Sequence, residues 1–237
     1  MIHTKHTKEV GIMGLESKVV LITGAGSGLG AAAAISFAKE GAAVVLCGRR
    51  PEKIERLQNT IIEEGGEAVA IPADVSVEAE VARLIGRIDE LYGRIDILVN
   101  NAAVFEPGTV SETSLASWNY QFDNNVTSAF LVTRASLPLM RKHAYGRIVN
   151  ITSALAHNGS GGFAAYSASK AALESLTRTV ADDEIGHDIL INMFNPGAIK
   201  TEMHATGRDP FAVVPELLKL ATLPKHGISG KLIDAAV

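Results

Sequence analysis

The hydrophobic positions of this chain alternate between two patterns. Short runs of β-branched and aliphatic residues, such as VVLIT at 19–23 and AVVLC at 43–47, have the length and composition of buried strands. Between these two runs, apolar residues recur at helical spacing through AAAAISFAKE, and Gly41 ends that segment. The order of strand, helix and strand predicts a βαβ unit with parallel strands.

The same alternation continues through most of the chain. Further strands are predicted at 67–75 (including an exit loop), 96–100, 146–153, 188–194 and, more weakly, 230–234. Further helices are predicted at 51–64, 76–92, 115–142 and 164–184. We expect one α/β domain over residues 15–237, doubly wound, with a mostly parallel seven-stranded sheet flanked by helices on both faces. Residues 1–14 are expected to form a flexible arm, and 202–229 a mostly irregular lid region.

Composition narrows the classes of partner. Of 237 residues, 47% are hydrophobic and 20% are charged, which is enough to bury a large core. The formal net charge of −4 provides no basic field, so neither nucleic acid nor membrane is an expected partner. The single cysteine, Cys47, cannot form an intramolecular disulfide, and no secretory or transmembrane segment is found, which favours the cytoplasm. His3 and His6 are interpreted as solvated, so no metal site is predicted.

A glycine cluster joins the first predicted strand to the first predicted helix. Backbone N–H groups at such a helix N-terminus can receive a pyrophosphate, and glycines let the backbone approach it closely. A turn that serves only packing is the alternative, but the position in the first strand–helix connection favours a phosphate site. We therefore expect a Rossmann-type fold that binds a dinucleotide through Gly24, Ser27, Gly28, Leu29 and Gly30.

A tyrosine and a lysine lie four residues apart, at Tyr166 and Lys170, within the last long predicted helix. This spacing places a phenol and an ammonium on one helical face. Such a pair is commonly an exposed surface pair. Ser153, which ends a predicted strand thirteen residues earlier, and the glycine cluster make an accidental combination much less frequent.

Together these motifs resemble the short-chain dehydrogenase/reductase family over about residues 16–203. The shared order is TGxxxGxG, Asp74-Val75, Asn100-Asn101-Ala102-Ala103, Asn125, Ser153, YxxxK and Pro196-Gly197 with Thr201. Ala103 stands where the family usually has glycine. The compact branch that includes carbonyl reductases and 3-oxoacyl-carrier-protein reductases is the most similar.

The resemblance implies a role for each matched residue. Tyr166 donates or accepts the proton, Ser153 holds the substrate oxygen, Lys170 binds the nicotinamide ribose, and Asn125 supports a proton relay. Asn124 and Thr152 compete with Asn125 and Ser153, and the register of the family motifs favours the latter two. The implied cofactor contacts are Asp74 and Val75 at the adenine, Asn101 and Ala102 near its ribose, and Tyr166, Lys170, Pro196, Gly197, Ile199 and Thr201.

Elementary chemistry agrees with these roles. Hydride addition to a carbonyl builds negative charge on oxygen, which must be stabilised and then protonated. A free phenol has a pKa of about 10, and we expect Lys170 and the charge of the oxidised nicotinamide to lower the pKa of Tyr166.

The end of the second predicted strand favours NADP(H). Enzymes that prefer NAD usually place an acidic residue there, whereas this chain has Gly48 followed by Arg49 and Arg50. Guanidinium groups can pair with a 2′-phosphate and stack on adenine. Solvated arginines at a helix start are the alternative, and Ser27 lacks the basic side chain of many NADP-using relatives, so NAD(H) stays possible.

The expected function is interconversion of a carbonyl (a ketone, aldehyde or 3-oxoacyl group) and an alcohol. The resemblance implies a homotetramer or homodimer assembled through the helices at 115–142 and 164–184. The alternatives are a non-enzymatic NADP-binding sensor, an NAD-preferring alcohol or sugar dehydrogenase, and a sugar-nucleotide epimerase. The epimerase needs a larger substrate domain than the residues after Pro196 can build.

Overall fold

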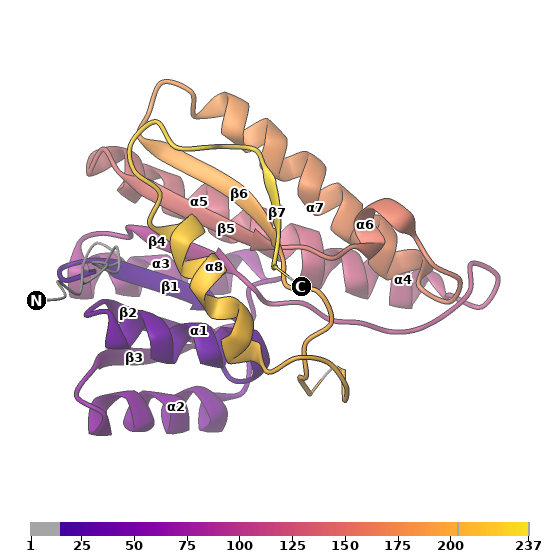
Figure 1. Ribbon diagram of the computed structural model, residues 1–237, viewed down its shortest axis with the longest axis horizontal. Coiled ribbons are helices and arrows are strands. Elements are labelled where there is room, and N and C mark those ends of the chain that lie inside the picture. The colour runs from indigo at the N-terminus through magenta and orange to yellow at the C-terminus, as the bar shows by residue number, and fades with distance from the viewer. Residues whose placement is uncertain (1–14, 203, 237) are drawn as a thin grey trace, which may run out of the picture.

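The computed structural model describes residues 15–202 and 204–236, so the predicted arm at 1–14 lies outside the described residues. Seven strands form one sheet (Figure 1) in the order β3-β2-β1-β4-β5-β6-β7. Every neighbouring pair is parallel. The predicted α/β fold is therefore confirmed, with strands β1 (Val19–Thr23), β2 (Ala43–Gly48), β3 (Glu67–Pro72), β4 (Ile97–Asn100), β5 (Gly146–Ile151), β6 (Ile189–Asn195) and β7 (Leu232–Asp234).

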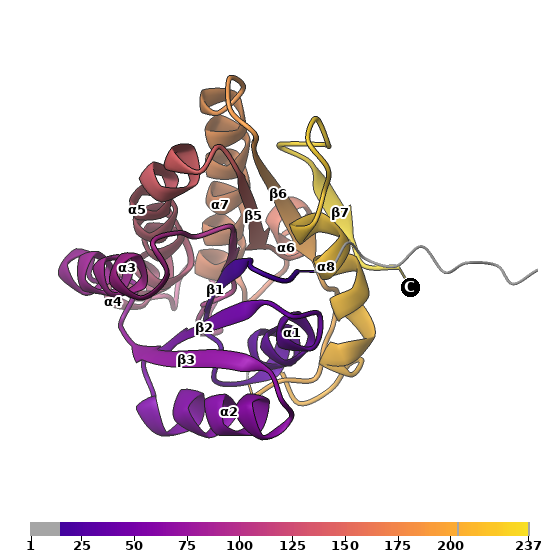
Figure 2. The same ribbon diagram turned by 90° about the vertical axis from the view of Figure 1, so that its left-hand side faces the viewer.

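Helices cover both faces of this sheet. Figure 2 shows α3 and α5 on one side of the central strands and α1 and α8 on the other. Buried side chains of α2 join the cluster under α1 and α8, whereas those of α7 join the cluster under α3 and α5. The helices are α1 (Gly28–Lys39), α2 (Pro51–Glu63), α3 (Glu78–Tyr92), α4 (Leu115–Phe122), α5 (Ser128–Lys142), α6 (Leu155–Asn158), α7 (Ala164–Asp183) and α8 (Val214–Ala221).

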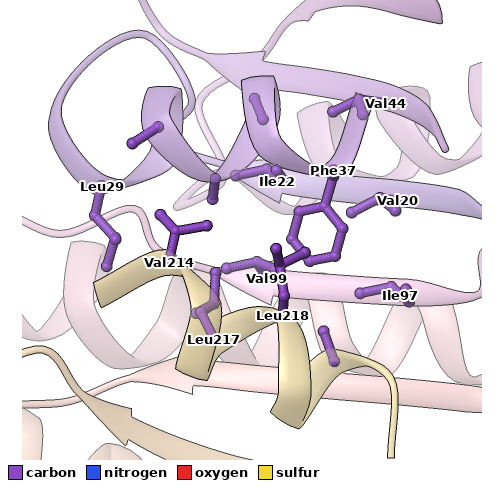
Figure 3. Packing of buried hydrophobic residues seen from close by; sticks show 14 of the residues in the cluster. Val20, Ile22, Leu29, Phe37, Val44, Ile97, Val99, Val214, Leu217 and Leu218 are labelled. Carbon is purple, nitrogen blue, oxygen red and sulfur yellow. The ribbon is translucent and has the colours of Figure 1, made fainter. Parts of the chain in front are cut away.

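The prediction of a mostly irregular lid at 202–229 is wrong for its central part. A short 3₁₀ turn at Pro210–Val213 leads into α8, whose apolar face is buried. Figure 3 shows Val214, Leu217 and Leu218 of α8 packed near Phe37 of α1 and Val99 of β4. This segment completes the core on one face of the sheet, because the spacing of its apolar residues gives it one continuous apolar stripe.

The predicted single helix at 115–142 is interrupted. Between α4 and α5, residues Asp123–Thr127 form a π-helical turn. A π turn adds one residue to the helical circuit and so shifts the side chains that follow. Asn124 and Asn125 lie in this turn and both are buried.

The strand order fixes where a ligand can bind. The chain runs from β1 outward to β2 and β3, then returns to β4 on the other side of β1. At such a switch point the connecting loops diverge and leave a crevice beyond the carboxyl ends of the strands.

Candidate active site

A cavity of about 830 Å³ opens at the carboxyl edge of the sheet. Its walls come from the segments that follow six strands, β1 to β6. The predicted site residues that line it are Gly24, Ser27, Gly28, Leu29, Arg49, Asp74, Val75, Asn101, Ala102, Ser153, Tyr166, Lys170, Pro196, Gly197, Ile199 and Thr201. Gly30 and Asn125 are not among the lining residues. The volume suits a dinucleotide with a small substrate beside it.

The glycine loop leaves room for phosphate groups at the start of α1. A Cβ on Gly28, whose φ is +55°, would lie 2.9 Å from Cγ2 of Thr201, and one on Gly30 would lie 2.4 Å from the Gly24 carbonyl oxygen. Asn101 holds the loop from the other side, since its Nδ2 donates to the carbonyls of Thr23 and Gly24 at 3.0 and 3.1 Å. The Ser27 side chain makes no capping bond, which leaves the first N–H groups of α1 for an anion. These residues fit the pyrophosphate of a dinucleotide.

Tyr166 and Ser153 meet in this cavity. Their side chains share a hydrogen bond, and Ser153 Oγ also accepts one from the backbone N–H of Leu155 at 3.3 Å. Burial raises the pKa of Tyr166, and the Ser153 hydrogen bond lowers it in part. The pKa of Tyr166 is therefore raised rather than lowered as expected from the sequence, because burial outweighs the Ser153 hydrogen bond.

Lys170 is buried beneath the tyrosine. Its Nζ donates to the carbonyl of Ile151 at 2.9 Å and lies 5.7 Å from the centre of the Tyr166 ring. Only 3% of the residue is exposed, and this desolvation lowers the pKa of Lys170 to about 8. The site therefore holds an amine that titrates near physiological pH.

Asn125 uses its side chain to hold a loop. Its Nδ2 donates to the carbonyl of Val104 at 3.0 Å and to Ser169 Oγ at 2.9 Å, and its Oδ1 accepts from the N–H of Val104 at 2.8 Å. The neighbouring Asn124 is the one that lines the cavity. Since all side-chain hydrogen-bonding groups of Asn125 face the protein, this side chain positions the segment after β4.

The far end of the cavity is rich in arginine. Arg49 NH1 lies 4.0 Å from Asp74 Oδ2, and both side chains are partly exposed. Glu202 reaches across from the loop after β6 and pairs with Arg50 and Lys53 at the start of α2. Lys53 first, and then Arg50, lower the pKa of the Glu202 carboxyl.

Sequence reasoning did not find the aromatic wall beside Tyr166. The rings of Phe105 and Phe163 stack at 5.2 Å, and Phe105 meets Tyr166 edge-on at 5.4 Å. Both phenylalanines line the cavity, as does Leu155 at the start of α6. All three lie outside the strands and helices predicted from the sequence, so no spacing pattern indicated them. The same holds for Glu202.

In residues 15–202 and 204–236, no three metal-ligating side chains gather at one place, and none of the helices is both long and apolar enough to cross a bilayer.

A dinucleotide cleft with Ser153, Tyr166 and Lys170 at one end defines the class of nicotinamide-dependent oxidoreductases. Comparison with known proteins narrows this class. Residues 18–210 match the model of the short chain dehydrogenase family. This chain belongs to that family, whose members are NAD(P)-dependent dehydrogenases and reductases.

The names of individual relatives refer to different substrates. A 3-oxoacyl-(acyl-carrier-protein) reductase from Synechocystis sp. is 38% identical over 190 residues, which are 80% of this chain and 77% of the relative. A meso-2,3-butanediol dehydrogenase from Serratia marcescens is 38% identical over 191 residues, which are 81% and 75% of the two chains. The structure is also similar, with a TM-score of 0.87 and 29% identity, to a 3-oxoacyl (acyl-carrier-protein) reductase from Agrobacterium tumefaciens C58 with NADP bound, and 94% of each chain is covered.

Proposed function

We propose that this protein is an NADP(H)-dependent oxidoreductase that reduces a ketone or aldehyde and, in reverse, oxidises the corresponding alcohol. The observation that carries the proposal is the convergence of Ser153, Tyr166 and Lys170 at one end of a cavity whose other parts fit a dinucleotide.

Each of these side chains has a definite task. When bound, the nicotinamide supplies or takes up the hydride. Ser153 donates a hydrogen bond to the substrate oxygen, and Tyr166 gives that oxygen its proton, or removes it in the reverse direction. Lys170 binds the ribose hydroxyls of the nicotinamide nucleotide. Burial keeps the Tyr166 phenol protonated, which suits a proton donor in the reductive direction.

Asn125 is a positioning residue in the proposed mechanism. Its amide holds Val104, and so fixes the loop that carries Asn101, Ala102 and Phe105 along the cavity wall. A proton relay at Asn125 would have to use its backbone carbonyl, since the side chain is fully engaged with Val104 and Ser169.

The wall beside Tyr166 indicates the substrate class. Phe105, Phe163 and Leu155 present an apolar surface next to the proposed proton donor. We infer a carbonyl compound with an apolar substituent, and the family resemblance makes a 3-oxoacyl group one member of that class.

NADP(H) is the proposed cofactor. Gly48 at the end of β2 presents no carboxylate to a 2′-phosphate, and Arg49 and Arg50 follow it on the rim of the cavity. An NAD-preferring dehydrogenase is the alternative, and the ratio of kcat/KM for NADPH to that for NADH separates the two.

The test of the function as a whole is NADPH oxidation with a panel of aliphatic and aromatic ketones and aldehydes. If the protein binds NADPH but reduces none of these compounds, the proposed activity is wrong and a non-enzymatic NADP-binding sensor is the better interpretation.

We also propose one domain over residues 15–237, a cytoplasmic location, and assembly into a homotetramer or homodimer. Cys47 is free and buried, in agreement with a reducing compartment. The helices expected to form the interface carry large exposed apolar side chains, among them Leu115 and Phe130.

A further inference from the structure

Glu174 is a buried carboxylate to which the proposed mechanism gives no task. It lies on α7 one turn beyond Lys170, on the face that also carries Tyr166, and only 1% of it is exposed. Burying a carboxylate costs free energy unless polar partners replace the lost water, and an apolar residue at such a position is often at least as stable. The partners of Glu174 therefore indicate what it is for.

Its two oxygens bind both ends of one short segment. Thr152 Oγ1 donates to Oε1 at 2.8 Å, and His157 Nε2 lies 3.1 Å from Oε2. Arg178, on the same helix, lies 3.7 Å from Oε2. Thr152 is the first residue after β5, whereas His157 belongs to α6, which lies beside α7 (Figure 1). Glu174 thus clamps residues 152–157 onto α7.

That segment contains Ser153, the group proposed to bind the substrate oxygen. Ser153 follows Thr152 directly, and its Oγ accepts from the Leu155 N–H. Ala154 and Leu155 line the cavity. A shift of this segment would therefore move the Ser153 hydroxyl relative to Tyr166, and also the apolar wall relative to the substrate.

We propose that Glu174 is a positioning residue for the carbonyl reaction: through Thr152 it fixes the Ser153 hydroxyl against Tyr166, and through His157 it fixes α6 along the substrate side of the cavity. This inference rests on the proposed function, because it assigns a task within the same site.

The fold offers a matched control. Glu184 ends α7 and is equally buried, and it pairs with Arg141 and with His187 at 3.2 Å. It thus has a similar set of partners, but it does not line the cavity. Glu174→Gln and Glu184→Gln each remove one buried negative charge from the same helix while keeping side-chain size.

The experiment compares kcat, the KM for the carbonyl and the Kd for NADPH in the wild type and four variants. For Glu174→Gln we expect kcat to drop about tenfold or more, since small misplacements of reacting groups have effects of up to about a hundredfold. Thr152→Val should reproduce the drop in kcat. His157→Asn, altered at a half-exposed position, should instead raise KM several-fold with kcat near the wild-type value. All four variants, including Glu184→Gln, should keep the NADPH Kd, and Glu184→Gln should also keep kcat and KM.

A second readout needs no turnover. Hydrogen–deuterium exchange of the amides in 152–157 should be faster in Glu174→Gln and unchanged in Glu184→Gln, because only the first variant releases this segment. Wild-type exchange and kinetics in a folded Glu174→Gln, or equal kinetic losses in both glutamine variants, overturn the inference. If Glu174→Gln does not fold, wild-type kinetics in both Thr152→Val and His157→Asn overturn it. A wild type that reduces no carbonyl contradicts the proposed function, and the exchange result then decides the clamp separately.

Discussion

At the scale of single residues, two effects act in opposite directions on the pKa of Tyr166: burial raises it, and the hydrogen bond from Ser153 lowers it. The first keeps the phenol protonated, and the second orients its oxygen. Replacing the hydroxyl removes the proposed proton donor but leaves the ring that packs against Phe105. For Tyr166→Phe we therefore expect kcat to decrease by about 10² to 10⁴ with an unchanged Kd for NADPH, as is typical for loss of a general acid. Stopped-flow NADPH oxidation and fluorescence titration measure the two quantities.

Tyr120→Phe is the control for that variant, because Tyr120 lies on α4 and is partly exposed. It should have wild-type kinetics. Full activity in Tyr166→Phe would show that the proton comes from another group.

Lys170 offers a prediction about stability and pH. Its pKa is lowered from 10.5 to about 8 by burial, so between these values the unfolded chain binds more protons than the folded chain. The free energy of unfolding of the wild type should therefore rise relative to Lys170→Met as pH increases from 8 to 10.5, by about 3 kcal/mol in total. Urea unfolding of both proteins across this range measures the difference, in which titrations common to both cancel. A flat difference would mean that the ammonium is solvated in the folded state.

Sequence reasoning was most effective for residues identified by spacing. Ser153, Tyr166 and Lys170 occupy fixed intervals, and the structure brings them together in one cavity. Asn125 and Glu174 show where such reasoning stops. The partners of Asn125 are the backbone of Val104, 21 positions away, and Ser169, 44 positions away, and the two shortest contacts of Glu174 come from outside its own helix. Apart from the pair of Glu174 with Arg178 four residues later, these contacts join segments that are far apart in the sequence, and they leave no local pattern in the chain.

At the scale of elements, the loop after β6 closes over the cofactor end of the cavity through Glu202. Its carboxylate forms ion pairs with Arg50 and Lys53, two cations that could otherwise bind a 2′-phosphate. Glu202→Gln should therefore bind NADPH more tightly by up to about fivefold, the range of an exposed charge pair, while the affinity for NADH changes less.

Fluorescence titration with each cofactor tests this prediction. Glu63→Gln, at the exposed far end of α2, is the control and should bind both cofactors as the wild type does. Weaker binding of NADPH by Glu202→Gln would show instead that the carboxylate helps to hold the loop over the bound cofactor.

Two elements were misjudged from the sequence for different physical reasons. In α8 the signal was present, because Pro215 opens a segment whose apolar residues share one face, but the helix is short and follows a long irregular stretch. The π turn at Asp123–Thr127 had no such signal, since its side chains continue an ordinary helical pattern. Only the hydrogen-bond register distinguishes a π turn, and tertiary contacts such as those of Asn125 stabilise it.

At the scale of the whole molecule, the parallel sheet explains why residues from distant parts of the chain share one site. All strands point their carboxyl ends to the same edge, so the segments that follow β1 to β6 meet there. The alternation of apolar strands and amphipathic helices made this topology predictable. The shape of the substrate side was not predictable, because it depends on loop residues such as Phe105 and Phe163.

The surface of α4 and α5 leads to the last prediction. Leu115 is 74% exposed and Phe130 is 41% exposed, and Trp118 and Tyr120 lie on the same pair of helices. Large exposed apolar side chains of this kind are typical of a contact between copies of a chain. Light scattering should therefore give two or four times the chain mass of 25.0 kDa. Phe130→Glu, which replaces an exposed apolar side chain of α5 with a charge, should shift the protein toward the monomer. Ile62→Glu on α2, at an exposed position on the opposite face of the sheet, should not. A wild type of 25.0 kDa at every concentration would contradict the proposed assembly and leave the apolar surface to another partner.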